Sequence, residues 1–120
     1  MKKIMTIQMK IDDFGKPMKP QFVEIENTLK AMQEFVSGNI EVVNIGDIIV
    51  VMNEEGKLKD LPLNCILFDE NREVIDGLVG NILCCRVDSE GDFVSIKESD
   101  LEILEKHIIQ VYKKEVVLWQ

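Results

Sequence analysis

Two β-branched runs joined by Gly46-Asp47 constrain the fold more than any other feature of this sequence. Residues 40–45 are Ile-Glu-Val-Val-Asn-Ile and residues 48–52 are Ile-Ile-Val-Val-Met, so most positions favour extended backbone. A two-residue connection that contains glycine is typical of a tight hairpin turn. The sequence therefore predicts an antiparallel hairpin in the middle of the chain.

Shorter extended segments are predicted on both sides of this hairpin. Turns rich in Gly, Asn and Asp separate them. The segment Leu61–Asn64 contains Pro62, which a central strand does not accept, so we expect a connector or an edge there. The further predicted strands are residues 3–9, 21–25, 65–68, 73–75, 81–87 and 93–96, with 116–119 as a last strand or an apolar tail.

Two helices are predicted, each with a cap and an apolar stripe. Asn27 is a candidate N-cap for a helix that ends near Val36, before Ser37-Gly38. Ser99 and Glu102 have the spacing of a capping box for a longer helix that reaches about Lys114. The pattern predicts an α+β fold in one domain over residues 1–120, with a mostly antiparallel β-sheet and two main helices packed against it.

The charge of the chain argues against a nucleic-acid partner. There are 22 acidic and 14 basic side chains, for a net charge of −8. Such a surface repels phosphate. No apolar run approaches the roughly 18 residues that span a bilayer, and polar residues interrupt any signal sequence near the start. We expect a soluble, cytoplasmic protein with no membrane partner.

The residues needed for catalysis or metal binding are scarce. His107 is the single histidine, and Cys65, Cys84 and Cys85 lack the spacing of zinc ligands, so we expect buried thiols in a reducing compartment. Residues 88–92 (Asp-Ser-Glu-Gly-Asp) mimic the start of a calcium loop, but its later required positions do not match. We expect no metal, no cofactor and no catalytic residue, and so a protein that is not an enzyme.

Several motifs between about residues 24 and 105 occur together. They are Leu29–Gln33, Ile40–Val43, Val51–Leu58 with Asn-Glu-Glu-Gly-Lys-Leu, Leu61–Asn64 with Leu-Pro-x-Asn, Gly80 before an apolar strand, and Asp88–Phe93. In these motifs the chain resembles an uncharacterised family of small proteins of phages, prophages and conjugative elements of low-GC Gram-positive bacteria. Relatives tend to carry a basic residue where this chain has Cys65, so a site that depends on that residue is altered here. The resemblance implies a mobile-element origin and a role against host defence, without a mechanism.

We weigh three functional hypotheses. In the first, the protein binds and sequesters a small nucleotide-type host signal without catalysis. Polar and cationic side chains in or beside the turns between the predicted central strands would meet its phosphates and base. These ligand-binding candidates are Asn53, Lys57, Asn64, Arg72 and Arg86.

In the second hypothesis, an acidic face masks a host nuclease or another defence protein by occupying its basic groove. The candidates are Asp88, Glu90, Asp92, Glu98, Asp100, Glu102 and Glu105, with Lys97 as the one base between them. In the third, the protein is a homo-oligomer whose apolar segment 116–119 docks on a neighbouring subunit. The sequence slightly favours nucleotide sequestration.

Overall fold

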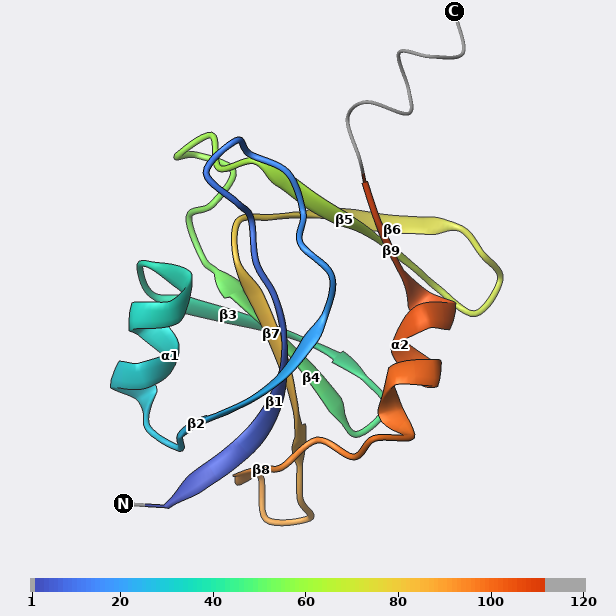
Figure 1. Cartoon of the computed structure of the whole chain (residues 1–120). Helices are drawn as coiled ribbons and strands as arrows, with labels where there is room; N and C mark the ends of the chain where they lie inside the picture. The colour runs from blue at the N-terminus through green and yellow to red at the C-terminus, as the bar shows by residue number, and fades with distance from the viewer. Residues whose placement is uncertain (1, 112–120) are drawn as a thin grey trace, which may run out of the picture.

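Two antiparallel sheets and two short helices make up residues 2–111, the part of the chain that the computed structural model describes (Figure 1). The elements in chain order are β1 (Lys3–Met9), β2 (Gln21–Glu26), α1 (Leu29–Val36), β3 (Ile40–Ile45), β4 (Ile48–Asn53), β5 (Leu63–Phe68), β6 (Val74–Val79), β7 (Ile82–Val87), β8 (Phe93–Val94), α2 (Asp100–His107) and β9 (Ile108–Gln110). This arrangement confirms the predicted α+β class, although the strands divide between two sheets. None of the helices between residues 2 and 111 is long and apolar enough to cross a membrane.

The order of the strands leaves β3 and β6 at the ends of their sheets. The larger sheet runs β2-β1-β7-β4-β3, with β8 paired to β7, and the smaller sheet runs β6-β5-β9. Every strand pairing is antiparallel. Neither β3 nor β6 has a second neighbouring strand among the described residues.

The predicted central hairpin is confirmed as β3 and β4. Their register runs from Ile40 opposite Asn53 to Ile45 opposite Ile48. Gly46 has a φ of 61° and Asp47 after it does not have a positive φ, and this combination is the backbone of a type II′ hairpin turn. All six residues of β4 are buried, because this strand lies between β3 and β7 with both of its faces covered.

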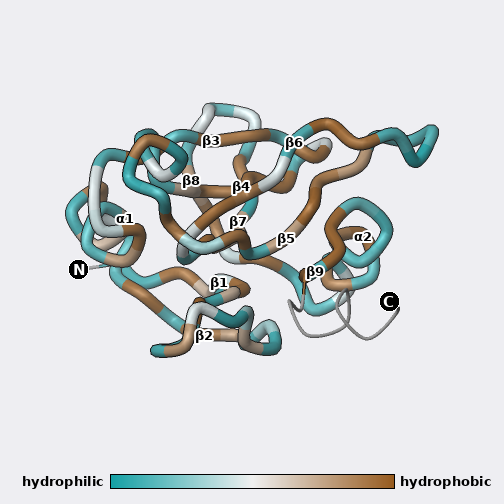
Figure 2. The backbone as a smooth tube through the Cα atoms, turned by 90° about the horizontal axis from the view of Figure 1, so that it is seen from above, coloured by the Kyte–Doolittle hydropathy of each residue, from teal (hydrophilic) through white to brown (hydrophobic). Residues whose placement is uncertain are grey.

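The larger sheet buries each of its faces in a separate core. One face packs under α1, whose Met32 and Val36 contribute to the first core. The opposite face, which we call the inner face, packs against the smaller sheet and α2. This second core includes Ile48 and Val50 of β4 and Leu67 of β5. Figure 2 shows the hydrophobic strands running through the middle of the molecule, with α1 and α2 at opposite ends.

The N-cap of α1 is Thr28, so the prediction of Asn27 as the cap is wrong by one residue. The Thr28 hydroxyl oxygen accepts a hydrogen bond of 3.0 Å from the backbone N–H of Ala31. Asn27 instead donates its side-chain amide to the carbonyl of Phe93, 2.9 Å away. The local spacing assigns the Asn27 side chain to the helix cap, but this side chain instead bonds to a residue 66 positions away in the sequence.

The second helix is shorter than predicted. It ends at His107, and Ile108–Gln110 continue as β9, paired with Cys65–Leu67 of β5. Ser99 makes no side-chain capping bond, so the predicted capping box does not form. Pairing with an available strand edge outweighs the helical pattern of the apolar residues here. The predicted segment 116–119 lies outside the described residues.

Asn64 fastens the smaller sheet to the larger one. Its side chain is fully buried, and the amide nitrogen donates to the carbonyls of Met9 and Gly80 at 2.9 and 2.8 Å. Met9 ends β1, and Gly80 lies between β6 and β7. One amide therefore satisfies two carbonyl groups that converge at the junction of the sheets.

Replacing Asn64 by alanine should lower the free energy of unfolding by about 2–4 kcal/mol, because two buried carbonyl groups lose their donor and a small cavity forms. Urea unfolding followed by circular dichroism measures this loss. Asn44→Ala is the matched control at an exposed position and should change stability by less than about 0.5 kcal/mol. Equal losses in the two variants would contradict this role of Asn64.

Candidate functional site

The edge strands β3 and β6 line a depression in two parts, which share no lining residue. Its larger part is a groove of about 680 Å³ at the inner face of β3, closed by the turn before β6 and by α2. Its smaller part is a hollow of about 210 Å³ between Glu41 on β3 and residues 76–79 on β6. We call the two parts together the trough, and Figure 2 shows β3 and β6 on the same side of the molecule.

The lining of the trough is strongly acidic. Among the described residues that line it, the basic side chains besides His107 are Lys57 and Arg86, and both already pair with carboxylates. Lys57 forms an ion pair with Asp76 across the hollow. The acids that line the trough are Glu41, Asp47, Glu54, Asp69, Glu70 and Asp76.

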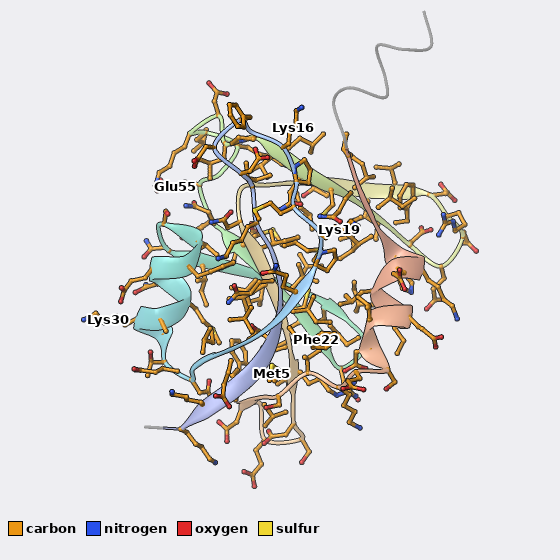
Figure 3. All side chains as sticks on the ribbon, in the orientation of Figure 1. Met5, Lys16, Lys19, Phe22, Lys30 and Glu55 are labelled. Atoms are coloured by element: carbon orange, nitrogen blue, oxygen red, sulfur yellow. The ribbon has the colours of Figure 1, made fainter. Side chains whose placement is uncertain are left out.

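The basic side chains of the N-terminal part of the chain lie elsewhere. Figure 3 shows Lys30 projecting from α1 on the opposite side of the molecule from α2, and Lys16 projecting from the loop after β1. Neither residue lines the groove or the hollow. The acidic trough and these two lysines therefore occupy different parts of the surface.

Arg86 and Asp100 join β7 to the start of α2 at the floor of the groove. The Arg86 Nη1 donates to the Asp100 carboxylate at 2.7 Å, and Nη2 lies 3.6 Å from the carboxylate of Asp47. The other Asp100 oxygen accepts from the backbone N–H of Lys97 at 2.9 Å. The Asp100 side chain is 2% exposed and that of Arg86 19%. The prediction of Asp100 on an exposed acidic face is therefore wrong.

The remaining acids of that predicted face form two groups. Asp88, Glu90 and Asp92 lie in the exposed turn after β7, with carboxylate oxygens within 4.8 Å of one another. The Asp88 carboxylate accepts from the backbone N–H groups of Glu90 and Asp92, which is the ordinary work of aspartate in a turn. The second group, on or just before α2, is exposed and consists of Glu98, Glu102 and Glu105.

The structure does not bring the five predicted ligand-binding residues together. Asn64 is inside the protein, as described above, and Arg72 donates to the carbonyl of Lys106 with its guanidinium 5.1 Å from the ring centre of Phe68. Asn53 holds the end of α1 through the carbonyls of Val36 and Ser37. Lys57 and Arg86 line different parts of the trough.

Sequence reasoning missed the residues that give the trough its shape. Phe68, Ile75 and Ile103 line the groove from β5, β6 and α2, and the last two are 58% and 40% exposed. Exposed isoleucines on separate elements become a site only when the two sheets pack. The exposure of these side chains would have pointed to the site, but exposure depends on the fold and cannot be taken from the sequence. The single histidine also lines the groove, with its Nδ1 3.1 Å from the Phe68 carbonyl.

The three cysteines lie in the core as free thiols. Burial raises the pKa of Cys65 from its ordinary value of 9.0 to about 12, and burial raises the pKa of Cys85 to about 12 as well. Burial also raises the pKa of Cys84, and the neighbouring thiols Cys65 and Cys85 add to that rise. Thiols in this state are poor nucleophiles, because the thiolate is the reactive form.

The trough and the two-sheet core define an α+β protein with an acid-lined depression between two strand edges. Residues 9–113 match the family described as "Domain of unknown function (DUF3846)", and the chain belongs to this family. The match extends from the end of β1 beyond β9, so it includes every element that lines the trough. Comparison with curated proteins and with solved structures gave no match.

Replacing Asp100 by asparagine should lower the free energy of unfolding by about 2–3 kcal/mol, because it leaves the partly buried Arg86 charge without its close partner. Thermal unfolding followed by circular dichroism measures the effect. Glu102→Gln makes the same chemical change on an exposed side chain of α2 and should cost less than about 0.5 kcal/mol. A loss no larger in Asp100→Asn than in this control would contradict the account.

The raised pKa values of the buried thiols predict that the folded protein loses stability in alkali. Their pKa is raised in the folded protein, so above about pH 9.0 the unfolded chain releases protons that the folded chain keeps. The stability that depends on Cys65 and Cys85 is complete below that pH and is lost as the pH rises toward about 12. Each thiol contributes a slope of up to about 1.4 kcal/mol per pH unit.

Urea titrations between pH 9 and 11 test this slope. In Cys85→Ala the fall of unfolding free energy with pH should be shallower than in the unchanged protein by about the contribution of one thiol. The substitution also lowers the unfolding free energy by an amount that does not depend on pH, and this constant loss does not affect the slope. Identical slopes in the two proteins would contradict protonated, buried thiols.

Proposed function

We propose that this protein is a non-enzymatic binding protein that takes a basic segment of another protein into the trough. The observation that carries the proposal is the charge of the lining. Six acids line the trough, and its lysine and arginine, Lys57 and Arg86, are already engaged by carboxylates. A cationic partner neutralises this surface, whereas an anionic partner adds to its repulsion.

The apolar lining of the groove supports a protein segment as the partner. Val43, Ile45 and Phe68 form apolar parts of its walls, and Ile75 and Ile103 remain substantially exposed at its rim. Aliphatic stems of lysine or arginine pack on such surfaces while their charged ends reach carboxylates. A groove that is apolar within and acidic around it therefore matches the chemistry of basic side chains.

The geometry favours this hypothesis over nucleotide sequestration, which the sequence slightly favoured. A phosphate in the groove would have to draw Arg86 away from the buried Asp100, and would lie near Asp47, Asp69 and Glu70. Leaving a buried carboxylate unpaired costs several kcal/mol. The trough therefore offers a nucleotide little net attraction.

The biological role we propose follows from the resemblance to proteins of phages and mobile elements. Such an accessory protein would oppose host defence by covering a basic surface of a defence protein, such as the nucleic-acid groove of a nuclease. The acids of α2, Glu102 and Glu105, would extend the negative field around the trough and speed association at low ionic strength.

Selection from a random peptide library on the immobilised protein should enrich peptides that combine basic and apolar residues. Their affinity should fall as salt is added, because exposed charge pairs are screened. The double variant Glu70→Lys/Ile75→Lys changes two exposed residues of the groove and should bind the selected peptides at least about tenfold more weakly. Fluorescence anisotropy with labelled peptides measures the affinities.

The control is Glu90→Lys, which repeats the glutamate-to-lysine exchange of the double variant outside the trough and should leave the affinity nearly unchanged. Enrichment of acidic peptides, or equal binding to both variants, would overturn the proposal. A nucleotide at about a hundred times its dissociation constant should stabilise the fold by about 2.7 kcal/mol. Such a shift, without peptide enrichment, would restore the nucleotide hypothesis.

A further inference from the structure

No strand of the described part of the chain pairs with the outer edge of β3, which presents its backbone groups beside the trough. The backbone N–H of Glu54 donates to the carbonyl of Asn39 at 2.9 Å, which continues the β3–β4 ladder by one pair. Pairs alternate along an antiparallel ladder, so residues 39, 41, 43 and 45 bond to β4. The two-residue turn leads to the same set, because the pair that flanks such a turn, here Ile45 and Ile48, is hydrogen-bonded. The backbone N–H and C=O groups of Ile40, Val42 and Asn44 therefore point away from the sheet.

The other edge strands of the described fold carry features that discourage pairing. Pro20 precedes β2, and Glu24 and Glu26 are exposed on it. The pairing of β6 with β5 contains two register shifts, and β9 has only three residues. Prolines, charges, irregular register and short length are the usual protection of strand edges.

The edge of β3 has little of that protection. Its six residues pair with β4 without a register shift, and it contains no proline and one charged residue, Glu41. Val42 is 40% exposed. A regular, mostly apolar edge of this kind is a template for another strand.

We propose that the basic segment of the partner binds as an added strand on the edge of β3. This inference rests on the proposed function and specifies how the segment is held. Its backbone hydrogen-bonds to Ile40, Val42 and Asn44. Every second side chain points to the inner face, over Val43 and Ile45 toward Asp47 and the acids before β6, and the others lie beside Val42.

Charge selects a basic segment over a second copy of this chain as the occupant. Two copies paired through β3 would each bring Glu41, Asp47 and Glu54 to the junction, on molecules that already carry a net charge of −8. A segment with lysine or arginine at every second position places its charges beside those acids instead.

Amide hydrogen exchange with a synthetic peptide tests the proposal residue by residue. The probe is an acetylated and amidated Lys-Val-Lys-Val-Lys-Val peptide. When about 90% of the protein is bound, exchange at the amides of Ile40, Val42 and Asn44 should slow by about tenfold. The amides of residues 41, 43 and 45 already bond to β4 and should change little. The same peptide N-methylated at alternate residues keeps the side chains but should bind at least about tenfold more weakly.

A matched pair of variants tests the same edge from the side of the protein. Val42→Pro removes one outward N–H from an edge strand, a position where proline is tolerated. Val42→Ala removes the side chain and keeps that N–H. The proline variant should bind the probe at least about tenfold more weakly than the alanine variant, with both folds checked by circular dichroism. If the proline variant does not fold, the N-methylated peptide makes the same comparison on the unchanged protein.

The outcomes separate this inference from the proposed function. If the probe binds and perturbs the trough without the alternating protection of β3, the added strand is overturned and the proposed function stands. If neither the probe nor any selected basic peptide binds, both are overturned. Protection of the same three amides in the protein alone, increasing with its concentration, would show that a second copy covers the edge and would overturn the inference.

Discussion

The fold depends on burying the inner face of the larger sheet against the smaller one. Ile48 and Val50 of β4 meet Leu67 of β5 and Leu78 of β6 in one core. Only one face of each sheet takes part in this contact, and the strands β3 and β6 are not hydrogen-bonded to each other. The trough is therefore a consequence of the packing. It is the space that remains where two sheets share a core and leave their edges apart.

The ion pair of Arg86 and Asp100 decides the electrostatic character of that space. Arg86 faces the inner side of β7, where an unpaired guanidinium would attract anions. The buried Asp100 carboxylate neutralises it and, through the N–H of Lys97, also fixes the start of α2. One buried carboxylate therefore both positions a helix and offsets the positive charge of Arg86, which also lies near Asp47 at the groove.

The sequence predicted those parts of the fold that local patterns determine. The β3–β4 hairpin followed from β-branched runs and the Gly46 turn, and α1 followed from its apolar stripe. The end of α2 could not be predicted, because Ile108–Gln110 become a strand only through pairing with β5. The burial of Asp100 and Asn64 likewise depends on groups that are distant in sequence. The candidate site was therefore less predictable than the fold, because its walls come from segments that are distant from one another in the sequence.

The central claim is that the trough attracts cations, and paramagnetic relaxation tests it without a partner. Nuclear magnetic resonance spectra of the protein would be recorded with a cationic and with an anionic nitroxide of similar size. The cationic probe should broaden the amides of 43–47 and 68–71 more strongly than the anionic probe does, and added salt should reduce the difference. Stronger broadening of these amides by the anionic probe would show that Arg86 dominates the groove, and would contradict the account.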